Sequence, residues 1–100
     1  MKNILLVCAA GMSTSLLVNK MREAAKNVDE EITINALPVS ECPSVIDTVD
    51  IVLLGPQVRF QKPQVEEYAK GRIPVEVIDM RFYGTMNGKA VLESALKLIK

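Results

Sequence analysis

The sequence predicts a single α/β domain built on a doubly wound, four-stranded parallel sheet with helices on both faces. Its 100 residues suit one domain with one hydrophobic core, so residues 1–100 are treated as a unit. Short apolar runs alternate along the chain with segments whose apolar residues recur at helical spacing. The resulting order, a strand and then a helix four times over, is typical of parallel sheets with right-handed crossovers.

The first strand is expected over Asn3–Val7, where the run is almost entirely apolar, as in strands buried on both faces. The first helix is expected from Ser13 to about Asn27, because apolar side chains fall on one helical face and charged ones on the other. Ser13 or Thr14 is expected to cap this helix.

The segment Glu31–Leu37 alternates apolar and polar residues, which favours an edge strand with one wetter face. Pro38 is expected to end this strand. Pro43 suits the first turn of a short helix over Ser44–Val49, since the first N–H groups of a helix have no acceptor within it.

The third strand is expected over Asp50–Leu54, a second run of buried character that Gly55-Pro56 stops. Helical spacing returns over Gln64–Lys70. The fourth strand is expected over Pro74–Ile78, and an amphipathic helix over Lys89–Ile99 closes the chain.

Three breaks in this pattern fall after predicted strands. They are Cys8–Ser15, Gly55–Gln57 and Asp79–Gly84. Because ligands of open parallel sheets bind at the carboxyl ends of the strands, we expect one functional edge there.

Cys8 is the most informative residue of that edge, since it places a thiol on a strand-to-helix turn. Backbone N–H groups and the positive end of a helix converge at such a turn, which favours a thiolate and then a bound phosphate dianion. Gly11 permits close backbone approach and positive φ. The residues expected to surround the phosphate are Ala9, Ala10, Gly11, Met12, Ser13, Thr14 and Ser15.

Composition excludes several other functions. With 12 basic and 12 acidic side chains the formal net charge is zero, and no basic run could neutralise a row of phosphates. Two phenylalanines and two tyrosines are too few for a base-stacking platform. The chain has no histidine and no C-x-x-C pair, so a zinc site lacks its usual ligands. We expect no nucleic acid, metal or cofactor, and any catalytic histidine has to come from a partner.

The N-terminal region does not favour export. The apolar residues after Lys2 are barely enough for a signal peptide, and Val7 is a poor residue before a lipoprotein cleavage point. No segment approaches the ~20 apolar residues of a membrane span. We expect a cytoplasmic chain without direct membrane insertion, in which a thiol stays reduced.

Three motifs follow one another in order along almost the whole chain. They are Leu5-Leu6-Val7-Cys8 running into A-G-M-S-T-S-L-L-V at positions 10–18, V-L-L-G-P-Q at 52–57, and P-V-E-V-I-D at 74–79 with Tyr83-Gly84 close behind. On these motifs the chain resembles the IIB subunits of the lactose, cellobiose and chitobiose branch of the bacterial phosphoenolpyruvate-dependent sugar phosphotransferase system. The first two motifs look most like the cellobiose and chitobiose members.

This resemblance implies a phosphoryl carrier with a four-stranded parallel sheet. In that family a cysteine, here Cys8, accepts a phosphoryl group from a phosphohistidine on the IIA protein. It then donates the group to a sugar held by the membrane-embedded IIC protein, with a β-linked disaccharide of the cellobiose, chitobiose or lactose class implied here. We expect a free, monomeric subunit that reaches the membrane only through IIC.

Two alternatives remain. The family's fold and loop are similar to those of low-molecular-weight tyrosine phosphatases, whose nucleophile lies in a C-x5-R-[ST] loop. Thr14 stands at the position of that arginine, although Ser15 fits the final one, so the bidentate charge that stabilises a transferring phosphoryl group is missing. We therefore expect slow hydrolysis. A non-catalytic regulatory domain predicts instead that Cys8→Ser leaves function intact.

Cys42 and Asp79 are expected to play structural roles. Cys42 lies in a predicted turn and should be dispensable, because cysteines are often simply buried. Asp79 follows the fourth strand and is expected to orient backbone or a partner, since a carboxylate beside a phosphate repels it.

Gln57 and Tyr83 are candidates for contact with partner proteins. The segment Gly55–Gln57 is equally consistent with a simple turn, and Tyr83 is equally consistent with a core residue. Two interpretations also remain for Met12 and Phe82: they are core residues, or they belong to an apolar rim on which partner proteins dock.

Overall fold

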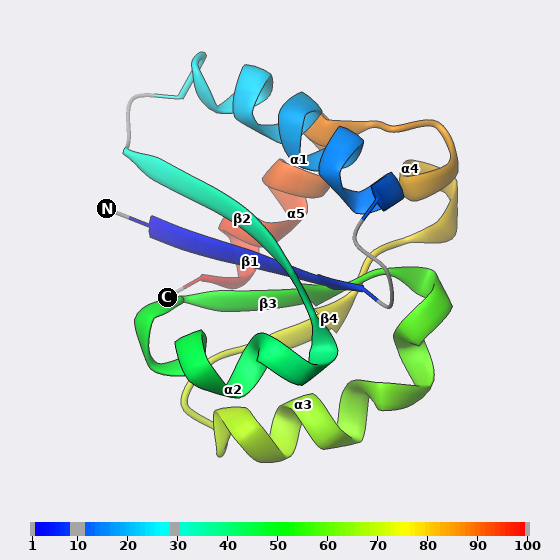
Figure 1. Ribbon diagram of the computed structural model, residues 1–100. Coiled ribbons are helices and arrows are strands. Elements are labelled where there is room, and N and C mark those ends of the chain that lie inside the picture. The colour runs from blue at the N-terminus through cyan, green and yellow to red at the C-terminus, as the bar shows by residue number, and fades with distance from the viewer. Residues whose placement is uncertain (1, 9–11, 29–30, 100) are drawn as a thin grey trace.

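The computed structural model describes residues 2–8, 12–28 and 31–99, with the side chains of the first helix described from residue 16 onward. Four strands form one sheet in the order β2-β1-β3-β4 (Figure 1). Every neighbouring pair is parallel, which confirms the predicted fold class. The strands are β1 (Lys2–Cys8), β2 (Ile32–Pro38), β3 (Ile51–Leu54) and β4 (Val75–Val77).

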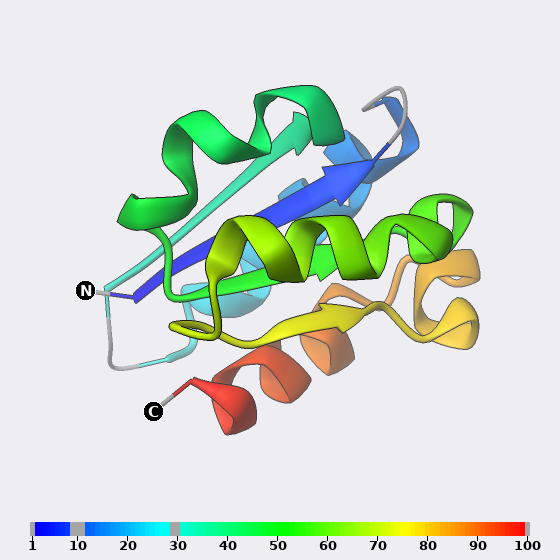
Figure 2. The same ribbon diagram turned by 90° about the horizontal axis from the view of Figure 1, so that it is seen from below.

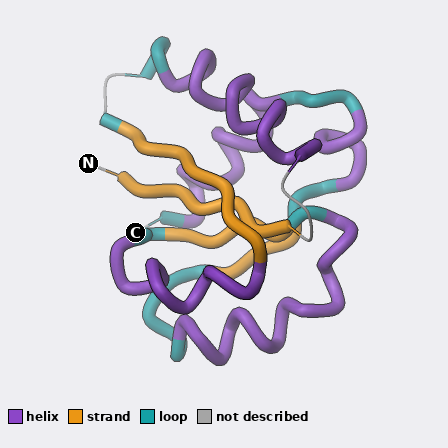
Figure 3. The backbone as a smooth tube through the Cα atoms, viewed as in Figure 1, coloured by secondary structure: helices purple, strands orange, loops and turns teal. Residues whose placement is uncertain are grey.

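Helices cover both faces of the sheet. Figures 1 and 3 show α1 and α5 on one face and α2 and α3 on the other. The helices are α1 (Met12–Ala25), α2 (Cys42–Val45), α3 (Lys62–Ala69), α4 (Met80–Gly84) and α5 (Gly88–Leu98), with 3-10 turns η1 (Val39–Glu41), η2 (Ile46–Thr48) and η3 (Pro56–Gln61).

Strand β1 divides the core in two because successive side chains of a strand point to opposite faces. Ile4 and Leu6 pack on the face that α1 and α5 cover. Leu5 and Val7 pack on the face that α2 and α3 cover. All four side chains are at most 1% exposed, so both faces of β1 are fully buried, as its apolar run predicts.

The predicted elements are present, with differences at their ends. β2 is an edge strand that ends at Pro38, as predicted; Pro38 is its last residue, where the missing N–H is tolerated on an edge. Asp79–Gly84 is not a simple break, since residues 80–84 form the short helix α4. α1 begins at Met12, one residue before the expected start, so Ser13 and Thr14 lie in its first turn and neither precedes the helix as a cap does.

Gly88 brings α5 against α1. A Cβ built on Gly88 would lie 2.5 Å from the carbonyl carbon of Lys20 and 2.5 Å from the backbone nitrogen of Met21. These are backbone atoms and cannot move aside as a side chain does. Glycine is therefore required for this helix contact, which holds α1 over the sheet.

We predict that Gly88→Ala lowers the free energy of unfolding by about 2–3 kcal/mol, because the added methyl group overpacks the contact of α5 with α1. Urea denaturation measures the change. Gly84→Ala is the matched control, since Gly84 ends a helix and has nothing within 4 Å of its Cβ position. We expect that control to be neutral or more stable by at most ~1 kcal/mol. Equal losses in the two variants would contradict the close-approach explanation.

Candidate functional site

Cys8 is the last residue of the central strand β1 and lies at the carboxyl edge of the sheet. Its side chain is buried, at 4% exposed. Backbone hydrogen bonds continue past the strand ends, from Gly55 N to Val7 O at 2.8 Å and from Ile78 N to Leu54 O at 2.8 Å. The segments that follow β3 and β4 therefore leave the sheet at the edge where β1 ends (Figure 2).

Helix α1 begins at this edge and runs back over the sheet (Figure 1). The expected phosphate-binding residues Ala9, Ala10 and Gly11 lie outside the described residues. Residues 12–15, Met12 to Ser15, form the first turn of α1, where backbone N–H groups have no acceptor within the helix. Together with the helix dipole, such N–H groups favour an anion near Cys8.

Gln57 and Tyr83 approach the edge from different segments, η3 and α4, with Gly55 between them. A Cβ built on Gly55 would lie 3.1 Å from Oε1 of Gln57, 3.7 Å from Cε2 of Tyr83 and 3.7 Å from O of Val7. Gln57 is exposed, as a partner-facing residue has to be. Tyr83 is 8% exposed and packs in the core beneath α1 and α5. Phe82 is half-buried against the same core.

Asp79 organises the backbone of this edge by capping α4. Its Oδ1 accepts hydrogen bonds from Arg81 N at 2.8 Å and Arg81 Nε at 3.2 Å, and its Oδ2 pairs with Arg81 Nη2 at 3.1 Å. The side-chain hydrogen bonds from Arg81, followed by the backbone one, hold the pKa of Asp79 below its ordinary value. Its carboxylate is thus engaged within its own helix turn.

A hollow of about 540 Å³ opens between η3 and α4, and it is called the edge hollow below. Phe60 and Met80 are 73% and 63% exposed there, the largest values among the exposed large hydrophobic residues of the described chain. The described residues that line the edge hollow are Pro56, Gln57, Arg59, Phe60, Met80, Tyr83 and Gly84. Arg59 and Phe60 were not predicted from the sequence, and their only signal is that they follow a strand. Met80 lies within the predicted break Asp79–Gly84 but was not a candidate site residue.

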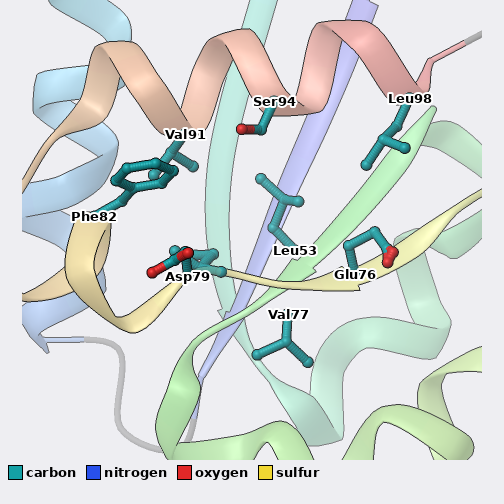
Figure 4. Close-up of a pocket in the computed structure, with 9 residues that line it drawn as sticks. Leu53, Glu76, Val77, Asp79, Phe82, Val91, Ser94 and Leu98 are labelled. Atoms are coloured by element: carbon teal, nitrogen blue, oxygen red, sulfur yellow. The ribbon is translucent and has the colours of Figure 1, made fainter.

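A second hollow of about 280 Å³ lies between β4 and α5 and is called the β4–α5 hollow. Figure 4 shows Val91, Ser94 and Leu98 on α5 facing the sheet, whereas Val77 points away from α5. Its rim carboxylate Glu76 pairs with Lys62 at 3.8 Å. Asp79 and Phe82 also line this hollow, so it borders the edge, whereas Leu98 lines it from the last position of α5.

Cys42 is fully buried in the core on the α2 and α3 face, at 0% exposed. Burial raises the pKa of the Cys42 thiol, because desolvation disfavours the thiolate. A protonated, enclosed thiol is a poor nucleophile. This placement agrees with the structural role expected for Cys42.

We predict that the free energy of unfolding falls as the pH rises above about 8.5, the ordinary pKa of a free thiol, and that Cys42 causes part of this fall. Above that pH the unfolded chain releases the Cys42 proton, whereas the folded chain retains it. The contribution of Cys42 to the free energy of unfolding is therefore constant below that pH and decreases above it. Urea denaturation from pH 7 to 10 measures the slope against Cys42→Ala, in which this component disappears. Identical slopes in the two proteins would contradict the assignment.

The fold and the edge together define a class of protein. It is a small α/β domain with a thiol at the end of its central strand, next to the N-terminus of a long helix. Such a site suits a nucleophile that handles an anionic group. Within the described residues, no helix is both long and apolar enough to cross a membrane.

Comparison with known proteins gives the family. Residues 3–94 match the model of the "PTS system, Lactose/Cellobiose specific IIB subunit" family. The oligo-beta-mannoside-specific EIIB component of Bacillus subtilis is 46% identical over 100 residues, which cover 99% of this chain and 97% of that protein. The cellobiose-specific EIIB component of Lactococcus lactis subsp. lactis is 41% identical over 104 residues, covering 98% and 96%.

Solved structures agree with this result. The solution structure of the cellobiose-specific IIB component from Borrelia burgdorferi has a TM-score of 0.80 at 46% identity, covering 98% of this chain and 91% of that one. The lactose-specific IIB domain from Streptococcus pneumoniae shares the fold, with a TM-score of 0.86 at 19% identity over 99% and 98% of the two chains. The chain belongs to the lactose/cellobiose family of phosphotransferase-system IIB components and is a phosphoryl carrier in sugar phosphotransfer.

Proposed function

We propose that Cys8 carries the phosphoryl group between a phosphohistidine on the IIA protein and a sugar held by the IIC membrane protein. The observation that carries this proposal is the position of Cys8 at the end of β1, beside the first turn of α1, in a IIB-family chain. The chain contains no histidine, so the phosphohistidine has to belong to the partner. The expected location is the cytoplasm, at the membrane through IIC.

In the first transfer, the Cys8 thiolate attacks phosphorus in line with the histidine nitrogen of the donor. The S–P bond forms as the N–P bond breaks, and the electron pair of that bond stays on the imidazole nitrogen. Negative charge on the three equatorial oxygens is stabilised by N–H groups of the α1 N-terminus, with residues 9–15 as the proposed cradle. Met12–Ser15 can contribute through their free backbone donors.

In the second transfer, a sugar hydroxyl oxygen attacks the same phosphorus. The S–P bond breaks, its electron pair returns to Cys8 as thiolate, and the hydroxyl proton passes to a base on the transporter side. We propose a β-linked disaccharide of the cellobiose, chitobiose or lactose class as acceptor. Relatives named for cellobiose and for oligo-beta-mannosides support a β-linked sugar, whereas the relative named for galactose, a monosaccharide, does not bear on the linkage.

We predict that Cys8→Ser abolishes phosphorylation, while Cys42→Ser keeps it within about twofold of wild type, because Cys42 is fully buried among apolar side chains. The proteins are mixed with phosphoenolpyruvate, the general phosphotransferase proteins and a cognate IIA, and intact mass counts the added phosphates. Wild type should gain one phosphate. A phosphate that survives Cys8→Ser, or no phosphate on folded wild type with several IIA proteins, would overturn the proposal.

We also predict that the phosphorylated protein releases phosphate to water much more slowly than it transfers the group. Thr14 occupies the position of the phosphatase arginine, so no guanidinium from that position stabilises attack by water. Intact mass followed over time after removal of IIA measures the lifetime, and an aryl phosphate tests turnover. Turnover above that of Cys8→Ser would favour the phosphatase alternative instead.

A further inference from the structure

We propose that the edge hollow is the docking surface for the phosphohistidine-bearing donor protein, with Phe60 as its apolar anchor and Arg59 as its charged one. This inference rests on the proposed role of Cys8 and adds the donor's contact residues. The edge hollow lies between the segments that follow β3 and β4, at the edge where Cys8 ends β1. A donor that reaches Cys8 has to cover part of that edge.

The apolar side chains of the edge hollow do not serve to stabilise the fold. Phe60 and Met80 remain mostly exposed, so they remove little apolar surface from water when the chain folds. They come from η3 and α4 and line the same hollow with Pro56. Exposed aromatic and methionine side chains that share a concave surface are typical of the buried centre of protein interfaces.

The charge of the edge hollow is one-sided. Arg59 Nη1 contacts Met80 Sδ at 3.9 Å, and among the described residues no carboxylate lies within ion-pair distance of its guanidinium. None of the described residues that line the hollow is acidic. Asp79, next to Met80, is engaged by Arg81. A partner face that complements this surface is apolar and carries negative charge.

This charge favours the donor over the acceptor as the occupant. The donor arrives with a phosphoryl group of about two negative charges. The acceptor arrives with a neutral sugar hydroxyl, and by then the negative group is already on Cys8. An exposed cation without an acidic partner speeds the approach of an anionic protein and stabilises the encounter. Arg59 thus acts chiefly on the first transfer.

The test measures the two transfers separately. In the first, phosphorylated IIA is varied in single-turnover reactions and intact mass gives the half-saturating concentration and the maximal rate. We expect Arg59→Glu and Phe60→Ala each to raise the half-saturating concentration at least ~10-fold, while the maximal rate changes less than ~3-fold. Arg59→Lys, which keeps the charge, should stay within ~3-fold of wild type.

Two controls match these variants. Lys26→Glu makes the same charge change at an exposed residue just after the C-terminal end of α1, and Leu98→Ala truncates an exposed side chain of the β4–α5 hollow. Both should stay within ~2-fold of wild type.

In the second transfer, protein that has been fully phosphorylated at high IIA is mixed with vesicles that hold the cognate IIC and sugar. We expect Arg59→Glu to change that rate less than ~2-fold.

The outcomes separate this inference from the proposed function. If Cys8 is phosphorylated normally and Arg59→Glu and Phe60→Ala match wild type, the docking surface is wrong and the carrier role stands. If Arg59→Glu slows only the transfer to sugar, the occupant is the transporter and the inference is also wrong. If Cys8 of wild type accepts no phosphate, the carrier role fails first. Thermal unfolding of each variant confirms that the chain remains folded.

Discussion

The parallel pairing of β1 on both sides is the constraint on which the rest of the molecule depends. β1 pairs with β2 from Lys2 through Cys8 and with β3 over residues 4–7, so its backbone is held along both edges. Side chains from both cores hold its faces. Because every strand runs in the same direction, the ends of all four meet at one edge. The position of Cys8 is therefore fixed by the whole sheet.

The edge contains buried residues, which fix the position of the thiol, and exposed residues, which are free to contact partners. Cys8 and Tyr83 belong to packed elements, and hydrogen bonds between neighbouring strand ends continue to Gly55 and Ile78. Phe60 and Met80 stand on short helical turns and contribute little to the core. A substitution at the exposed part can change recognition with little effect on the position of the thiol. Different residues therefore position the sulfur atom and provide the surface for partner contact.

Much of the fold could be predicted from the sequence because its signals are local. The apolar run of β1 and the alternation of β2 correctly predicted a central and an edge strand. The helix at Met80–Gly84 was missed, because its five residues have no apolar period and its start depends on the Asp79 cap. Boundaries such as Met12 shifted by a residue or two, as helix ends commonly do.

The sequence pattern singles out the proposed centre of the site but not the residues around it. Cys8 could be selected from a strand, a glycine and three hydroxyl residues in sequence. Whether Tyr83 is core and Phe60 exposed depends on how α4 and η3 pack after the sheet has formed, and no local pattern encodes it. The same holds for Arg59, whose charge is informative because none of the acidic groups that the structure describes pairs with it.

In-line chemistry places one more condition on this edge. In the proposed first transfer the histidine nitrogen lies opposite Sγ of Cys8 across phosphorus, and in the proposed second transfer the sugar oxygen takes that same position. The two partners therefore need the same approach to Cys8 and cannot be bound there together. A donor held too tightly at the edge hollow delays the second transfer. The proposed recognition by one aromatic side chain and one exposed arginine, rather than by a large apolar face, suits a contact that has to form quickly and dissociate after each transfer.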